Sequence, residues 1–286
     1  MSEQQIMLAV VVLIFGLGFT LEVLSGKLKG AGRPWRDGGF TLAGILSHGL
    51  LAGPIAAGLA GYWAVQLFPD HAGGLSGINF WLAFSVIFVS QEFAHYWLHR
   101  LTHEKEWLWK IHRTHHTAEN LNMGVLYRYN IFWTMMLPQV WVGPFAIYLG
   151  LGMPYVLAVM VTFFVNAATH TAFRWDLWLR EKMPWSEPFW RVLEKVITLP
   201  DTHHAHHAWG PGSHLNGNYA VTLFIFDTLY GTAKIPNRRQ KRFGLPKARS
   251  FHWSEELFWP IVRKSDSSDR KHKKSSGRPK TAKASA

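Results

Sequence analysis

Residues 92–116 read EFAHYWLHRLTHEKEWLWKIHRTHH, a stretch in which histidine recurs at the spacing of a helix face. Side chains three or four residues apart lie one above the other on a helix, so each histidine box can present two or three imidazoles to one point. A third box at residues 203–207, HHAHH, repeats the HxxHH spacing of 112–116. The histidines on these faces are His99, His103, His112, His115, His116, His203, His206 and His207.

Imidazole is the commonest metal ligand in proteins because its neutral ring offers a nitrogen lone pair near neutral pH. The boxes supply at least eight candidate ligands, whereas one transition-metal ion rarely takes more than about six. The sequence therefore predicts a site for two ions. A loose metal-sequestering loop is the alternative, but such loops have low complexity. Trp107, Leu108, Trp109 and Ile111 lie between the first two boxes and indicate a packed helix instead.

Two further histidines are candidate ligands. His170 ends an apolar run, where an imidazole costs desolvation unless it is paired or binds a metal. His95 lies four residues before the first box, so it could be a ligand, a partner of a ligand or a lipid-facing residue. The remaining histidines are His48, interpreted as a packing residue, His71, His252 and His272, interpreted as solvent or tail residues, His204, expected off the ligand face, and His214, left open.

Three acids could hold the ligand histidines in place without binding the metal themselves. Glu92 lies seven residues before His99 on the same face of an apolar segment, where a carboxylate is costly and is by default a functional residue. It could accept the second ring N–H of a ligand histidine. Asp201 directly precedes the third box and could do the same or cap its helix. Asp227 could be such a partner or the ion-pair partner of an Arg or Lys.

The composition restricts the chemistry. None of the 286 residues is cysteine, which excludes disulfides, thiolate zinc sites, iron–sulfur clusters and cysteine nucleophiles. A nitrogen or nitrogen/oxygen ligand set suits iron, zinc, copper or nickel. The net charge is +12, of which residues 263–286 carry +7, with nine Lys or Arg against two Asp. Because long apolar runs accompany this charge and no nucleic-acid reader fold is visible, it favours a membrane surface as partner, and no nucleic acid is expected.

Apolar runs of the length of a membrane span recur along the chain. They cover residues 6–24, 40–68, 80–98, 131–151 and 154–168, the last two as a helical hairpin. We predict an all-α integral membrane protein with four or five transmembrane helices, since several runs could be re-entrant. Basic residues at 27–36 place that loop in the cytoplasm and the N-terminus outside. All three boxes then lie on the cytoplasmic side, in a helical cap.

The chain becomes polar and aromatic after Arg174. Trp175, Trp178, Trp185 and Trp190 stand near Arg and Lys, which is typical of helices at a membrane interface. Residues 263–286 are rich in Lys and Ser, so we expect a basic disordered tail that could touch anionic lipid heads. The predicted division is one membrane domain at 1–262, followed by this tail.

These residues also carry a resemblance to a known family. EFAHYWLHRLTH at 92–103, LWKIHRTHH at 108–116 and DTHHAHH at 201–207 resemble the fatty acid hydroxylase/sterol desaturase superfamily. So do NY at 218–219 and FDTLYGT at 226–232. The order of the boxes, their spacing and the flanking aromatic residues match over residues 80–235.

The resemblance implies a membrane-embedded, non-haem di-iron oxygenase with cytoplasmic histidine boxes. Carried over position by position, the metal ligands are His99, His103, His112, His115, His116, His203, His206 and His207, with His170 as the additional family histidine. Glu92 stands where the family often has an acid, whereas His95 and His204 depart from the pattern. The sequence shows no cytochrome b5 domain, so an external electron donor of the ferredoxin or cytochrome b5 type is expected.

The expected activity is O2-dependent hydroxylation of a fatty acyl, sterol-like or related lipid at two iron ions. A lipid desaturase with the same centre is the alternative, because substrate position relative to the metals decides between the two reactions. A histidine-rich metal transporter is disfavoured, since the first, second and fourth runs carry almost no polar residues. A zinc hydrolase is disfavoured because it uses three protein ligands per ion. We expect a prokaryotic inner-membrane protein and make no prediction of its oligomeric state.

Overall fold

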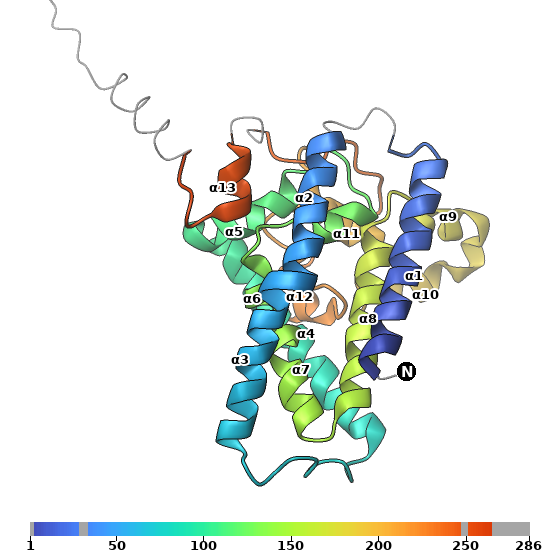
Figure 1. Ribbon diagram of the computed structural model, residues 1–286. Coiled ribbons are helices and arrows are strands. Elements are labelled where there is room, and N and C mark those ends of the chain that lie inside the picture. Colours follow the sequence, from blue (N-terminus) through green and yellow to red (C-terminus); the bar gives the residue numbers. More distant parts are fainter. Residues whose placement is uncertain (1–2, 29–33, 247–250, 265–286) are drawn as a thin grey trace, which may run out of the picture.

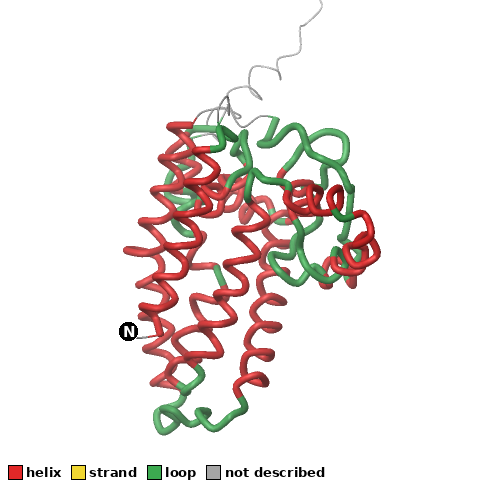
Figure 2. Tube along the Cα trace, turned by 90° about the vertical axis from the view of Figure 1, so that its right-hand side faces the viewer, coloured by secondary structure: helices red, strands yellow, loops and turns green. Residues whose placement is uncertain are grey.

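The computed structural model describes residues 3–28, 34–246 and 251–264, and within these ranges the chain is helical, with connecting loops and no strand (Figures 1 and 2). Long helices form a bundle, and short helices cap one end of it. The bundle consists of α1 (Glu3–Leu24), α2 (Pro34–Leu46), η1 (Ser47–Leu51), α3 (Ala52–Leu67), α4 (Phe80–Glu104), α7 (Pro138–Tyr148) and α8 (Gly152–His170). The remaining elements are α5 (Glu106–His116), η2 (Met123–Tyr127), α6 (Trp133–Met136), α9 (Trp175–Lys182), η3 (Pro184–Ser186), α10 (Glu187–Leu193), α11 (Pro200–His207), α12 (Ile225–Leu229) and α13 (Trp253–Phe258).

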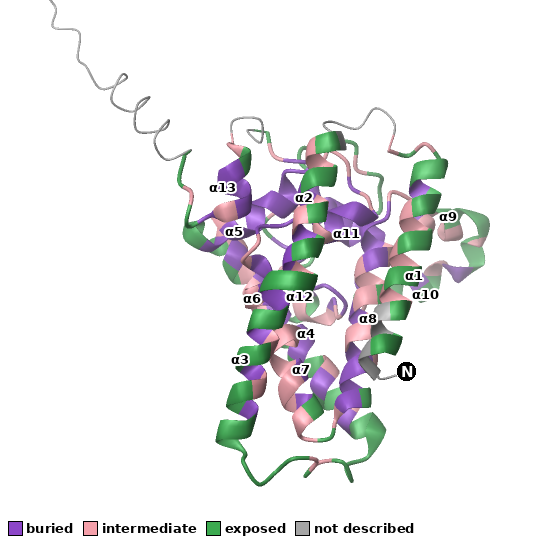
Figure 3. Cartoon of the chain, viewed as in Figure 1, coloured by how far each residue is buried: buried purple, intermediate pink, exposed green. Residues whose placement is uncertain are grey.

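Within the described residues, two helices are long and apolar enough to cross a membrane, namely Trp35–Leu67 and Gly152–His170, and the apolar helix Ala9–Leu24 is shorter. The outer faces of α1, α2 and α3 are largely exposed, whereas α11 is buried (Figure 3). The predicted hairpin is present as α7 and α8, but its first arm is not one continuous span. Leu137 is extended and Pro138 begins a new helix, so α7 has 11 residues and is about 16 Å long, against about 30 Å of hydrocarbon.

The three histidine boxes lie at the same end of the bundle. The carboxyl ends of α4 and α8 reach the cap, α5 follows α4 directly, and α11 lies beside the end of α8 (Figure 1). The three boxes, which are far apart in the sequence, therefore lie at the same end of the bundle, as a shared metal site requires.

A π-helical turn, η1, joins α2 to α3 without a break. The backbone N–H of Ala52 bonds to the carbonyl oxygen of Ser47, five residues back, and the Ser47 hydroxyl donates to the carbonyl oxygen of Ile131 at 2.9 Å. A Cβ at Gly53 would collide with the carbonyl oxygen of His48, so the turn requires glycine at that position. Such turns are rare and frequently stand at functional sites.

The C-terminal helix α13 is tied to the second histidine box by buried charges. Glu255 forms an ion pair with Arg113 of α5, and Glu256 forms one with Arg36 of α2. Glu256 also accepts a hydrogen bond from the Thr117 hydroxyl at 2.6 Å. These contacts fix the position of α5 from a segment far along the chain. The predicted disorder of the basic tail concerns 263–286, of which 265–286 lie outside the described residues.

The four predicted interfacial tryptophans differ in exposure. Trp175 is half-buried, and its ring N–H donates to the carbonyl oxygen of Ala168 at 2.8 Å. Trp178 and Trp185 are exposed, as interfacial rings would be, whereas Trp190 is buried and its ring N–H donates to the Ser186 hydroxyl at 2.9 Å.

Candidate metal centre

Nine histidines form two adjacent clusters. The first cluster consists of His99, His103, His112, His116 and His206, and the second of His115, His170, His203 and His207. Within each cluster the candidate ligand nitrogens all lie within 4.8 Å of one another. The clusters are in contact, since the ring centroids of His116 and His207 are 4.5 Å apart. The structure thus brings together every histidine of the predicted ligand set.

The second and third boxes each serve both clusters. His115 and His116 are neighbours in α5 but belong to different clusters, and so do His206 and His207 in α11. Successive side chains on a helix point about 100° apart, so one helix can face two ions on either side of it. The expectation that each box faces a single point is therefore wrong for these two boxes.

The nitrogen separations fit ligation of a single ion by each cluster. The Nε2 atoms lie 3.1 Å apart for both His112–His116 and His99–His206 in the first cluster, and 3.2 Å and 3.0 Å apart for His115–His170 and His170–His203 in the second. Two imidazoles that bind one ion at right angles with bonds of about 2.1 Å have nitrogens about 3.0 Å apart.

Unpartnered buried nitrogens also fit a metal pair. The Nε2 atoms of His103 and His207 are buried and have no hydrogen-bond partner in the described part of the chain. Burial, and then neighbouring imidazoles, lower the pKa of both His116 and His207 well below the ordinary histidine value. These rings are therefore neutral at physiological pH, with lone pairs available for a cation.

Backbone carbonyls orient several of the ligand rings. His99 Nδ1 lies 2.6 Å from the carbonyl oxygen of Tyr219, and His206 Nδ1 lies 2.7 Å from that of Gly217. His170 Nδ1 lies 2.8 Å from the carbonyl oxygen of Asn166. A ring that donates its Nδ1–H to a carbonyl leaves the Nε2 lone pair for a metal, which fixes both the tautomer and the ring plane.

Two of the three candidate acids act on the loop that supplies the carbonyls of Gly217 and Tyr219. Glu92 accepts from the Thr162 hydroxyl at 2.6 Å and from the backbone N–H of Thr222 at 2.9 Å. Asp227 accepts from the backbone N–H groups of Tyr219 at 2.9 Å and Ala220 at 2.7 Å. Both carboxylates therefore hold the 217–223 loop, so the link between acid and ligand runs through the main chain rather than through a direct contact.

Asp227→Asn is expected to weaken metal binding about 10- to 100-fold, the usual effect of losing a group that orients a metal ligand. The asparagine NH2 group cannot accept the hydrogen bond that one carboxylate oxygen now receives, so the Tyr219 carbonyl shifts from His99. Competition with a chelator measures the affinity. Thr228→Val in the same short helix is the control, because the Thr228 hydroxyl donates to the Lys195 carbonyl oxygen away from the site. Equal affinities in both variants would remove Asp227 from the metal site.

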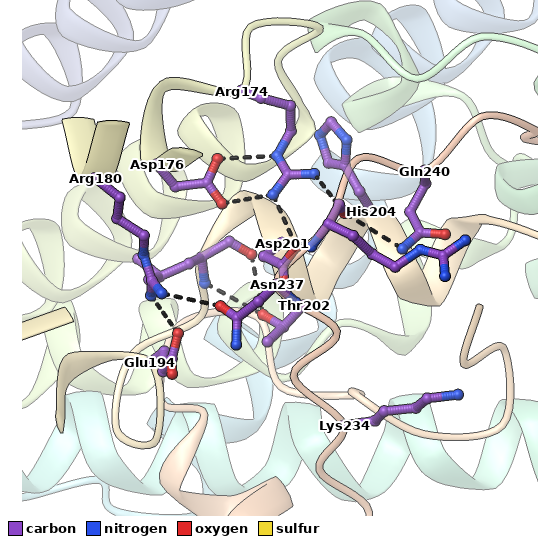
Figure 4. Close-up of polar contacts among 12 residues, drawn as sticks. Arg174, Asp176, Arg180, Glu194, Asp201, Thr202, His204, Lys234, Asn237 and Gln240 are labelled. Atoms are coloured by element: carbon purple, nitrogen blue, oxygen red, sulfur yellow. Dashed lines mark hydrogen bonds and ion pairs between the residues drawn. The ribbon is translucent and has the colours of Figure 1, made fainter. Parts of the chain in front are cut away.

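Asp201 has a different environment (Figure 4). Its carboxylate accepts from the buried Arg174 guanidinium at 2.9 Å and from the backbone N–H groups of Asn237 at 2.6 Å and Arg238 at 3.0 Å. Arg174 in turn forms a two-pronged pair with Asp176. Asp201 thus anchors the start of α11 to the 237–238 segment, and the cap residue of that helix is Leu199.

The histidines outside the clusters have other contacts. His204 Nε2 lies 3.1 Å from the carbonyl oxygen of Thr171, and His214 Nε2 lies 3.0 Å from that of Thr232. His95 is buried beside His99, with ring centroids 6.4 Å apart, but belongs to neither cluster. His71 is exposed, and His252 caps α13, while His272 lies outside the described residues.

A cavity of about 420 Å³ adjoins both clusters. Imidazoles of each cluster, among them His112 and His115, form part of its wall. The remaining wall is mainly apolar and aromatic, and includes Leu137, Val140 and Val159 from α7 and the segments beside it. The arrangement can hold a hydrocarbon chain with one part of it against the metal-binding nitrogens.

The fold and the site define a helical protein with a pair of imidazole metal clusters at the capped end of an apolar bundle. A sequence model described as "Fatty acid hydroxylase" matches residues 84–232. This range covers all three boxes and the acids Glu92, Asp201 and Asp227. The chain belongs to the fatty acid hydroxylase family.

Similar curated proteins act on lipids according to their names. The chain is 27% identical over 172 residues to alkylglycerol monooxygenase of Xenopus tropicalis, covering 58% of this chain and 33% of the relative. Alkylglycerol monooxygenase of Danio rerio is 28% identical over 192 residues, with coverages of 65% and 38%. Ornithine lipid hydroxylase OlsE of Rhizobium tropici is 30% identical over 169 residues, with coverages of 56% and 46%. The chain thus spans less than half the length of these relatives, and no solved structure matches it.

Proposed function

We propose that this protein hydroxylates a membrane lipid with O2 at a di-iron centre held by the nine clustered histidines. The cavity is the observation that carries this proposal, because its largely apolar wall reaches imidazoles of both clusters. Nitrogen ligands suit iron, and membership of the fatty acid hydroxylase family supports iron over the other metals that imidazole binds. The names of the relatives support a lipid substrate.

The two irons would supply the oxidising power that an unactivated C–H bond requires, with O2 as co-substrate and electrons from a ferredoxin- or cytochrome b5-type donor. The chain's own residues do the rest. The histidines fix the metal positions, and the carbonyl oxygens of Gly217 and Tyr219 fix the ring planes. The apolar wall excludes water and confines the substrate chain so that one carbon lies against the clusters. Glu92 and Asp201 act as positioning residues.

The proposal includes a membrane topology. α1, the continuous α2–η1–α3 helix, α4 and α8 would be the spans, with the cap and its boxes in the cytoplasm and the N-terminus outside. Residues 1–262 would form the oxygenase domain. The prokaryotic inner membrane is the proposed location. Cysteine substitutions at Gly74, in the loop between α3 and α4, and at Lys234, in the cap, tested with an impermeant thiol reagent, would report opposite sides, since the native chain has no cysteine.

Comparative lipidomics tests the activity. Cells that express the chain are expected to accumulate a lipid heavier by one oxygen, and cells that express His112→Ala are expected not to, because His112 belongs to the first cluster. His71→Ala, an exposed loop change, is the control. A product lighter by two hydrogens would show that the reaction is desaturation rather than hydroxylation. The proposal would be overturned if cells with the native chain and cells with His112→Ala had the same lipids although the native protein was loaded with iron and supplied with reductant.

A further inference from the structure

The exposed part of the cavity wall lies on two helices. Among the residues of its wall, the exposed ones are Val12 of α1, Ile45 of α2 and Gly49 of η1. All other wall residues are buried or half-buried. The opening, here called the lateral mouth, therefore lies between α1 and the α2–η1 helix. Tyr127 of η2 lies between its two sides, with its ring centroid 5.3 Å from that of Phe15 and 6.2 Å from that of His48.

Apolar side chains surround the lateral mouth. Leu13 and Leu17 are exposed beside Val12 on α1, and Leu46 and Leu50 are exposed beside Gly49 on the other side. Such a surface would be unfavourable in water but suits the hydrocarbon of a bilayer. The helix that carries Ile45 and Gly49 is also one of the two that are long and apolar enough to cross a membrane. In a bilayer the mouth would therefore face lipid chains.

His48 is a polar group at this opening. Its Nδ1 lies 3.4 Å from the Thr134 hydroxyl, and its Nε2 has no hydrogen-bond partner among the described residues. A hydroxyl that donates to Nδ1 leaves the proton on Nε2, which then can donate to an oxygen. The π-helical turn sets this side chain on the wall of the cavity. An imidazole among apolar helices costs free energy unless it is paired, so a ligand oxygen here would be stabilised.

We propose that the substrate is a bilayer-resident lipid that passes sideways through the lateral mouth, with an ester, ether or hydroxyl oxygen on His48 Nε2 and its chain in the cavity. This inference rests on the proposed lipid oxygenase function and specifies the route and the substrate class. It requires no path through the cap from water. The lipid chain passes between Val12 and Gly49 to reach the clusters.

Two glycines on this helix provide a matched test. A Cβ at Gly49, at the mouth, and a Cβ at Gly58, on the exposed side of α3, would each meet nothing within 4 Å. Gly49→Trp is expected to lower lipid turnover in nanodiscs roughly tenfold or more, whereas Gly58→Trp is expected to leave it unchanged. Val12→Trp and Leu21→Trp, the second at an exposed position of α1 away from the mouth, repeat the comparison from α1, should Gly49→Trp not fold.

Metal content and retained lipid separate the outcomes. All four variants are expected to keep the iron content of the native protein, while Gly49→Trp and Val12→Trp retain less lipid in native mass spectrometry. His48→Phe, which keeps an aromatic ring, is expected to raise KM with little change in kcat. Full turnover in both mouth variants would overturn the lateral route. A native protein that binds iron but modifies no lipid would instead overturn the proposed function, and unchanged KM in His48→Phe would remove the oxygen contact.

Discussion

His206→Ala and His207→Ala are each expected to lose one of two bound ions, and each is expected to lose a different one. The two residues are neighbours in α11, but His206 belongs to the five-histidine cluster and His207 to the four-histidine cluster. Each change removes one imidazole from one cluster and leaves the other cluster complete. Lipid hydroxylation should fall below detection in both variants, because the proposed reaction needs both ions.

The metal-to-protein ratio by elemental analysis checks this result, and an iron spectroscopy such as Mössbauer distinguishes which site is empty. His204→Ala is the matched control on the same helix. Its ring contacts the Thr171 carbonyl oxygen and belongs to neither cluster, so the variant is expected to lose about 1 kcal/mol of stability and to keep both ions. Two retained ions in His206→Ala or His207→Ala would contradict the division into clusters.

Glu255→Ala is expected to destabilise the protein by about 3–5 kcal/mol, the usual cost of leaving a buried charge without its partner. Glu255 is fully buried and pairs with Arg113, which is 5% exposed and stands between His112 and His115 in α5. The melting temperature should fall by roughly 10 °C. Because the same change loosens the second box, bound metal is expected to decrease with it.

The control for this prediction lies on α5, the helix that carries Arg113. Glu106 is 3.8 Å from Lys110 in an exposed pair, so Glu106→Ala is expected to change stability by no more than about 0.5 kcal/mol. Thermal unfolding in one detergent measures both variants. If the two melting temperatures agree, α13 has no part in holding the second box. Such a result would confine the metal site to the segment that matches the family.

The histidine spacing predicted eight of the nine clustered residues because the helical repeat is fixed by backbone geometry, and His170 was predicted from its place at the end of an apolar run. It did not predict how they divide, since that depends on the placement of α5 relative to α11. The carbonyl oxygens of Gly217 and Tyr219 could not be found from side-chain identity, because every residue carries one. Asp227, in contrast, was a candidate from the sequence, and only its main-chain partners were missing.

The fold, too, could be predicted from the sequence only in part. Apolar runs predicted α1, α3, α4 and α8, whose lengths follow from composition. The break at Pro138 could have been read from the sequence, since proline at that position removes a helical N–H group. The pairing of Arg113 with Glu255 spans 142 positions and depends on the tertiary fold alone. So does the lateral mouth, whose two sides are set by the placement of α1 and of the α2–η1 helix.

Because the backbone carbonyl oxygen of Tyr219 orients His99, the metal centre should respond differently to substitutions and to insertions or deletions in this loop. A scan that exchanges side chains one by one would pass over this oxygen, since Tyr219→Phe keeps the oxygen beside His99. Insertion or deletion of a single residue at 218–222 would shift it and empty the first cluster. Chain length in this short connection is therefore as tightly constrained as the identity of any histidine.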